Sequence, residues 1–155
     1  MKNTTLCYIE ENGSYLMLHR VKKDHDENRG KWIGVGGKCE EGESPDDCVR
    51  REVLEETGLS LKSTRMRGII TFVSDEWGTE YMFLYEASAY PGVLKECPEG
   101  DLAWIKKESI EKLNLWEGDR IFLRLLQDAT PFFSLKLVYR GGTLLEAILN
   151  GESIQ

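Results

Sequence analysis

The chain has 155 residues, enough to bury a proper core, and we expect one domain over residues 1–155. Lys and Arg number 20 and Asp and Glu number 27, and the resulting charge of −7 argues against binding of duplex nucleic acid. No apolar stretch approaches the roughly 20 residues of a membrane span, and no signal-peptide pattern opens the sequence. Four scattered cysteines without a C-x-x-C pair favour a cytoplasmic protein with reduced thiols.

The first predicted elements form a β-hairpin. Residues 4–9 and 15–21 are short apolar runs on either side of an Asn-Gly turn sequence. A charged stretch over 22–31 is expected to be an exposed loop. The segment 32–38, WIGVGGK, is too rich in glycine for a plain strand, and it indicates backbone that must approach something closely.

A helix is predicted to follow this glycine segment. Ser44 suits the N-cap, Pro45 suits the first helical position, and two aspartates then meet the positive end of the helix dipole. The helix should run to Thr57 and stop at Gly58, because glycine readily adopts the left-handed conformation of a helix end.

The second half of the chain mixes strands and helices. Strands on both sides of a helix, together with hairpins, predict a mixed sheet with helices on its faces, in the α/β or α+β class. The expected elements are a hairpin over 67–74 and 80–89, strands over 102–105 and 132–140, helical segments over 108–113 and 118–128, and an unassigned apolar segment over 143–149.

Three carboxylates lie on one face of the first predicted helix. Glu52, Glu55 and Glu56 are spaced i, i+3 and i+4, so like charges meet near a helix C-terminus that itself disfavours them. Carboxylate oxygens suit Mg²⁺ or Mn²⁺, which would relieve this conflict. The alternative is a solvated acidic face that Arg50 and Arg51 partly balance.

The sequence around these carboxylates resembles a known family motif. Residues 37–59, GKCEEGESPDDCVRREVLEETGL, resemble the Nudix box, G-x5-E-x7-R-E-U-x-E-E-x-G-U, in which U is apolar. The resemblance implies an α/β/α sandwich around a mixed β-sheet and metal-dependent hydrolysis of a nucleoside diphosphate linked to another group. The fixed positions are all met, by Gly37, Glu43, Arg51, Glu52, Val53, Glu55, Glu56, Gly58 and Leu59.

The family resemblance also implies a metal site. Glu52, Glu55 and Glu56 would bind Mg²⁺, with Mn²⁺ as a possible substitute. A carbonyl oxygen of Gly36 or Gly37 would complete the ligand set. The residues alone leave open which glutamate accepts the proton of the attacking water.

Two further roles follow from the same resemblance. Glu43 would hold Arg51, and Arg51 would orient the first of the metal-binding glutamates. A further carboxylate is expected from a loop outside the box. Glu99 is the candidate, with Glu96 and Asp101 as alternatives.

On the substrate side, the chain resembles MutT-type members that cleave oxidised purine nucleoside triphosphates. Two positions depart from that pattern: Ile33 replaces an asparagine that reads the base, and Gly118-Asp119 replaces a pair of aspartates. An apolar Ile33 would give looser selectivity, because polar contacts discriminate better than apolar ones. The candidate substrate contacts are Lys22 or Lys23, Trp32, Ile33, Lys38, Trp116 and Asp119.

The leading hypothesis is therefore a Mg²⁺-dependent hydrolase that converts a nucleoside triphosphate to a monophosphate and pyrophosphate. Oxidised dGTP is the favoured substrate, and a monomer or homodimer is expected. ADP-ribose, a sugar nucleotide or a capped RNA end is the alternative substrate. A nucleotide-sensing or RNA-contacting domain without activity, and a purely structural acidic helix, are the alternatives from other classes.

Overall fold

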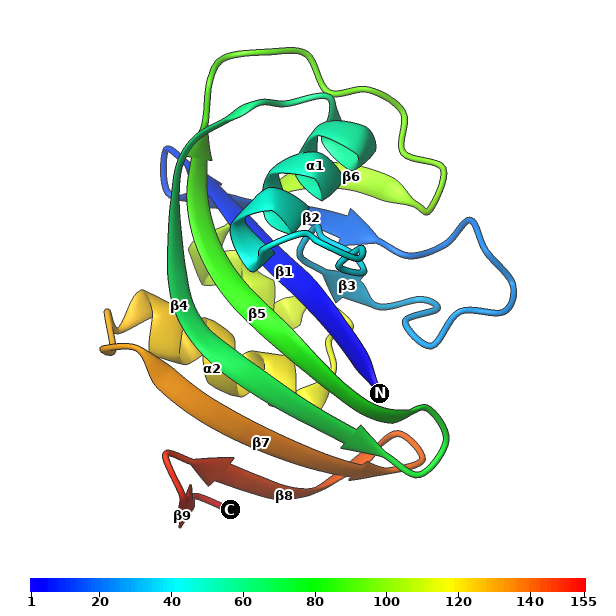
Figure 1. Ribbon diagram of the computed structural model, residues 1–155, viewed down its shortest axis with the longest axis vertical. Coiled ribbons are helices and arrows are strands. Elements are labelled where there is room, and N and C mark those ends of the chain that lie inside the picture. The colour runs from blue at the N-terminus through cyan, green and yellow to red at the C-terminus, as the bar shows by residue number, and fades with distance from the viewer.

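The computed structural model of the protein describes all residues 1–155, and one mixed sheet of nine strands runs through the chain. Helix α1 lies in front of this sheet and helix α2 lies behind it (Figure 1). The predicted α/β/α sandwich around a mixed sheet is thereby confirmed. The elements are β1 (Lys2–Glu11), β2 (Ser14–His19), β3 (Trp32–Ile33), α1 (Pro45–Thr57), β4 (Leu61–Ser74), β5 (Gly78–Ala89), β6 (Asp101–Lys106), the 3₁₀ helix η1 (Lys107–Lys112), α2 (Glu117–Gln127), β7 (Phe133–Arg140), β8 (Thr143–Leu149) and β9 (Glu152–Ser153).

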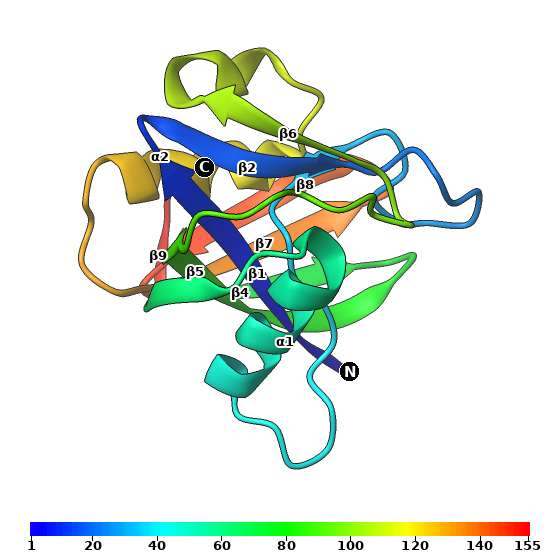
Figure 2. The same ribbon diagram turned by 90° about the horizontal axis from the view of Figure 1, so that it is seen from above.

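The strand order brings the first strand to the middle of the molecule. The sheet runs β3-β2-β1-β5-β4-β7-β8-β9, with β6 paired to β2. The β1–β5 and β4–β7 pairs are parallel and the other pairs are antiparallel. Seen from above, the long strands pass between the two helices (Figure 2).

The first hairpin opens a gap in the sheet where the glycine segment enters. β1 and β2 pair only near their turn, and β2 then diverges to pair with β3. The segment after β3 returns to β1 through isolated bridges of Val35 to Cys7 and of Lys38 to Thr4. The predicted irregular segment 32–38 thus runs beside β1, with the two residues of β3 at its start.

Helix α1 has the predicted bounds because both of its ends carry local signals. The Ser44 side chain accepts a hydrogen bond from the Asp47 N–H, and the Asp47 carboxylate accepts one from the Ser44 N–H, which satisfies two otherwise free donors. Gly58 closes the helix in the left-handed conformation at φ 80°. Val49 and Val53 are fully buried and pack on the apolar cluster between α1 and the sheet.

A second apolar cluster fills the space between the sheet and α2. Phe122, Leu123 and Leu126 form the buried face of α2 and pack against Tyr8 of β1 and Leu135 of β7. The two clusters on opposite faces hold α1 and α2 in fixed positions relative to the strands between them.

The sequence prediction differs from the structure in several segments. β4 begins at Leu61 rather than at residue 67, because register shifts let its first half stay paired with β5. Residues 107–112 form a 3₁₀ helix, and the unassigned segment 143–149 is strand β8. β2 ends at His19 rather than at residue 21.

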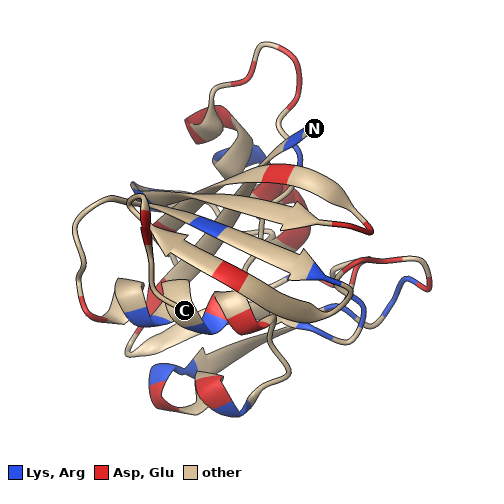
Figure 3. Cartoon of the chain, turned by 90° about the horizontal axis from the view of Figure 1, so that it is seen from below, with Lys and Arg blue, Asp and Glu red and all other residues tan.

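No helix or strand is basic throughout (Figure 3). No helix is both long and apolar enough to span a membrane. All four cysteines are free thiols, and Cys7, Cys48 and Cys97 are buried.

Candidate active site

A cavity of about 380 Å³ opens beside the glycine segment. Its wall combines β1, β4 and β5 with the 22–31 loop, the glycine segment, α1 and the start of α2. The wall contains both acidic and aromatic side chains. The lining residues are Thr4, Thr5, Leu6, Arg20, Asp26, Glu27, Asn28, Ile33, Gly34, Gly36, Gly37, Lys38, Glu52, Glu56, Phe72, Glu80, Met82, Glu99, Trp116 and Asp119.

Glu52, Glu56 and Glu99 form the acidic floor of this cavity. Glu56 is only 7% exposed, and the Gly36 N–H donates to its Oε2 over 3.3 Å. Burial, helped by the neighbouring Glu99 and Glu52, raises the pKa of Glu56 to about 8. The Gly36 N–H and Arg20 oppose this shift without overcoming it. A bound dication would stabilise the ionised form of these crowded acids.

The glycines of the loop let its backbone reach the floor. A Cβ at Gly37 would lie 2.5 Å from Cδ of Glu52, and a Cβ at Gly36 would lie 2.0 Å from the Thr5 carbonyl oxygen. Neither position therefore has room for a side chain. The Gly37 carbonyl accepts from the Thr5 N–H over 2.9 Å, whereas no hydrogen bond within the chain engages the Gly36 carbonyl. Of the two, the Gly36 oxygen is the one left free for a metal.

Arg51 connects the glycine segment to the acidic floor. Its Nε and Nη2 donate to Glu43 over 2.6 and 2.9 Å, which lowers the pKa of Glu43 to about 2. Its Nη1 donates to Glu52 over 2.7 Å, and its Nη2 donates to the Lys38 carbonyl over 3.0 Å. A planar guanidinium with five fixed donors can make all of these bonds together, which an ammonium cannot.

Glu55 differs from the two other glutamates of its helix. Its side chain is 60% exposed, it does not line the cavity, and it accepts from Arg51 Nη1 over 3.2 Å. No three His, Cys, Asp or Glu side chains form a ready-made metal cage. Mg²⁺ needs only one or two carboxylates because it usually keeps several waters, so the buried Glu56 and the partly buried Glu52 fit this ion.

Glu99 is the one candidate outside the motif that faces the cavity. Arg20 Nη1 lies 3.3 Å from its Oε2, and Lys23 Nζ lies 3.2 Å from its Oε1. The alternatives Glu96 and Asp101 have side chains 90% and 67% exposed and lie near Lys22 instead. Neither Lys22 nor Lys23 lines the cavity. Lys22 donates to the Cys97 carbonyl and lies near Glu96 and Asp101, and Lys23 lies near Glu99.

Phe72, Trp116 and Asp119 form the aromatic end of the cavity. Trp116 meets Phe72 edge-on, with ring centroids 5.4 Å apart. Asp119 is 6% exposed, and no hydrogen bond is among the influences on its carboxyl group. Burial raises its pKa to about 8, although the cations Lys31 and Arg120 act in the opposite direction. Asp119 is therefore largely protonated at neutral pH and can both donate and accept a hydrogen bond.

The NUDIX domain profile matches residues 2–126, which includes the acidic floor and the aromatic end. The chain belongs to the Nudix hydrolase family. The Nudix hydrolase YvcI of Bacillus subtilis is 33% identical over 124 residues, covering 77% of this chain and 75% of the relative. The oxidized purine nucleoside triphosphate hydrolase of Mus musculus is 34% identical over 106 residues, covering 66% of this chain and 67% of that protein.

Solved structures of the family share this architecture. A mutator MutT protein from Bacillus halodurans has 28% identity and a TM-score of 0.86, and the match covers 98% of this chain and 99% of that one. A MutT protein from Methanosarcina mazei Go1 has 26% identity and a TM-score of 0.73, covering 83% of this chain and 95% of that one.

Packing explains one departure of this Nudix hydrolase from the MutT-type pattern. A Cβ at Gly118 would lie 2.4 Å from Leu137 Cδ1 and 2.7 Å from Tyr139 Oη. The Gly118 N–H also donates to Tyr139 Oη over 2.6 Å, which keeps the two groups in contact. A second acid therefore has no room beside Asp119.

The remaining substrate candidates separate into two groups. Ile33 and Lys38 line the cavity. Trp32 does not, because it pairs with His19 in the β2–β3 ladder and its ring stacks on that histidine at 4.5 Å. The ring of Trp32 therefore lies outside the cavity wall, packed on the sheet.

Sequence reasoning missed the part of the cavity wall that the 22–31 loop supplies. This charged segment was expected to be solvated, yet Asp26, Glu27 and Asn28 line the cavity. The strand residues Phe72, Glu80 and Met82 were also missed, because they carry no motif and reach the cavity only through strand pairing.

Proposed function

We propose that this Nudix hydrolase cleaves nucleoside triphosphates to a monophosphate and pyrophosphate in a Mg²⁺-dependent reaction, with oxidised purine nucleotides such as 8-oxo-dGTP as its substrates. One observation carries the proposal: a single cavity joins the acidic floor to an aromatic end that contains the buried carboxyl of Asp119. The triphosphate and its metal would bind at the acidic floor, and the base would bind at the aromatic end.

Residues of the chain would divide the chemistry between them. Glu52, Glu56 and the Gly36 carbonyl would hold Mg²⁺, with Glu99 facing the same space. When bound, Mg²⁺ neutralises phosphate oxygens and lowers the pKa of water. Arg51 would keep Glu52 oriented through its bidentate anchor on Glu43.

The aromatic end supports a purine. Trp116 and Phe72 supply aromatic surface, and Ile33 and Met82 supply apolar contact. Asp119 would be the polar group that reads the edge of the base. Since Ile33 and Gly118 stand where the MutT-type pattern has polar readers, we expect broader selectivity among purines than in that group.

The names of relatives support the same substrate class. The Mus musculus and Danio rerio relatives are oxidized purine nucleoside triphosphate hydrolases, and a relative from Enterobacter sp. is the nucleoside triphosphatase NudI. We carry these activities to this chain as a proposal. We also propose that it acts as a monomer or homodimer in the cytoplasm, which suits its four free thiols.

A nucleotide panel with product analysis tests the proposal. The panel contains 8-oxo-dGTP, dGTP, dATP, dCTP and ADP-ribose, each assayed with Mg²⁺ and with EDTA. We expect monophosphate and pyrophosphate from the triphosphates, fastest with 8-oxo-dGTP, and no turnover in EDTA. Preferential cleavage of ADP-ribose, or release of single phosphates, would contradict the proposal.

A further inference from the structure

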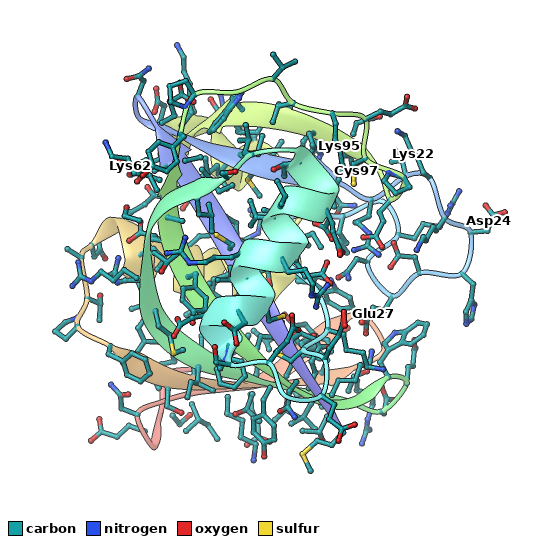
Figure 4. The ribbon with its side chains drawn as sticks, turned by 45° about the horizontal axis from the view of Figure 1, so that its top comes forward. Lys22, Asp24, Glu27, Lys62, Lys95 and Cys97 are labelled. Carbon is teal, nitrogen blue, oxygen red and sulfur yellow. The ribbon has the colours of Figure 1, made fainter.

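Side-chain hydrogen bonds of three consecutive residues hold the 22–31 loop beside the cavity. Asp26 accepts from Arg20 over 2.9 Å, Glu27 accepts from Lys2 over 3.2 Å, and Asn28 accepts from Trp116. In Figure 4, Glu27 lies on the side of the loop that faces α1, whereas Asp24 projects outward. The loop is thus a fixed wall of the cavity.

The side chain of Asn28 is oriented by its partner. Trp116 Nε1 donates to Asn28 Oδ1 over 2.9 Å. An indole N–H can only donate, so the amide oxygen must face Trp116 and the amide nitrogen must point elsewhere. Asn28 lines the cavity, and no acceptor in the chain binds its Nδ2. A free donor pair therefore lies at the aromatic end.

The backbone holds this asparagine independently of its side chain. The Asn28 N–H donates to Asp26 Oδ1 over 3.0 Å, and the Asn28 carbonyl accepts from the Lys31 N–H over 2.8 Å. Substitution of the side chain should leave the loop in place.

We propose that Asn28 is a specificity-determining residue whose Nδ2 donates to the oxygen at position 6 of a purine base. The inference rests on the proposed function, since it assumes that the base occupies the aromatic end. Every 6-oxopurine presents O6 as an acceptor, beside N7 in guanine and hypoxanthine or N7–H in 8-oxoguanine, whereas adenine presents an amino donor at that position. Asn28 Nδ2 is a donor and so matches O6, and the protonated Asp119 carboxyl in the same part of the cavity can accept from N7–H or donate to N7.

The competing account is that Asn28 serves only to hold Trp116. Asn28→Asp separates the two, because a carboxylate still accepts from the indole N–H but has no donor to offer. If Asn28 only holds Trp116, this variant will discriminate between bases as the parent does. If Asn28 reads the base, discrimination will be lost.

The test is calorimetric binding of the non-hydrolysable α,β-imido analogues of dITP and dATP in Mg²⁺. These ligands carry the same phosphate chain, so any general effect of the added negative charge cancels in their affinity ratio. We expect the parent to bind the dITP analogue at least about tenfold more tightly, and Asn28→Asp to reduce that ratio by about tenfold or more. An unchanged ratio would overturn the inference.

Asn114→Asp is the matched control. Asn114 lies beside the same loop, where its Nδ2 donates to the Gly30 carbonyl over 2.9 Å, but it does not line the cavity. Its ratio should equal that of the parent, and an equal loss there would also overturn the inference. The binding test does not depend on hydrolysis. A parent that prefers the dITP analogue but hydrolyses none of the panel nucleotides would therefore refute the proposed function and leave the role of Asn28 standing. A parent that binds neither analogue would refute both.

Discussion

The acidic floor and the aromatic end each contain a buried carboxyl group with a pKa raised to about 8, but their surroundings differ. Glu56 has two further acids beside it, Glu99 and Glu52, which raise its pKa beyond the effect of burial. Asp119 has no acid among the causes of its shift, and the nearby cations Lys31 and Arg120 lower its pKa. Crowded acids favour a dication, whereas a lone buried acid favours a proton.

The first prediction tests the acidic floor by removing the negative charge of Glu56. For Glu56→Gln we expect kcat to fall about a thousandfold, since losing a metal ligand removes several kcal/mol of charge stabilisation. Steady-state kinetics and Mn²⁺ binding by electron paramagnetic resonance would measure the loss of turnover and of metal. Glu41→Gln, at an exposed turn position before α1, is the control of equal charge change. Retention of a tenth of the parent's turnover would show that Glu56 is not a metal ligand.

The second prediction concerns Arg51, which binds Glu52 of the acidic floor and Glu43. Arg51→Lys should reduce kcat about 10- to 100-fold, because lysine keeps the charge but cannot bind Glu43, Glu52 and the Lys38 carbonyl together. Arg50→Lys is the neighbouring control, since Arg50 donates only to the Leu61 carbonyl. Equal activity of the two variants would mean that Arg51 acts through its charge alone.

The third test fills the space behind the aromatic end. Gly118→Ala should lower the free energy of unfolding by about 2 kcal/mol, because the new methyl group would overlap Leu137 and Tyr139. Denaturant melts would measure this change. Gly142→Ala is the control, since a Cβ there would meet nothing within 4 Å. A neutral Gly118→Ala would show that this packing is looser than the structure indicates.

The smallest expected effect is a pH dependence at the aromatic end. Asp119 binds its proton more tightly when folded, so its protonated form is lost as pH rises through about 8. If the neutral carboxyl contacts the base, affinity for the dITP analogue should fall about tenfold per pH unit above that value. Asp119→Asn should bind with no such fall, as titration calorimetry at several pH values would show. Parallel pH profiles for both proteins would exclude Asp119 as the titrating group.

The same ionisation has a consequence for stability. Asp119 contributes stability while protonated, fully below its unfolded pKa near 4 and progressively less as pH rises towards 8. The free energy of unfolding should therefore fall with pH over this range in the parent, and fall less in Asp119→Asn.

The sequence predicted those parts of the fold whose causes are local. Ser44 and Gly58 gave the bounds of α1, because capping bonds and a left-handed glycine act within a few residues. The first half of β4 could not be found in the same way. Its polar stretch is strand only because it pairs with the distant β5 across register shifts.

The same distinction between local and distant contacts applies to the residues of the site. Helical spacing predicted that Glu52 and Glu56 share a face, and the family resemblance implied the ion pairs of Arg51 within the same short segment. The partners of the 22–31 loop are the start of β1, the end of β2 and Trp116, which the fold alone brings together. A charged loop with distant partners has the same sequence pattern as a solvated one.

The contact of Gly118 with Leu137 also restricts how the pocket can change over time. A second carboxyl next to Asp119 would require a smaller residue in place of Leu137, since a side chain at position 118 would otherwise collide with Leu137. The two substitutions are therefore coupled, because each alone is expected to destabilise the protein. Stricter purine readers are therefore separated from this chain by at least two coupled steps.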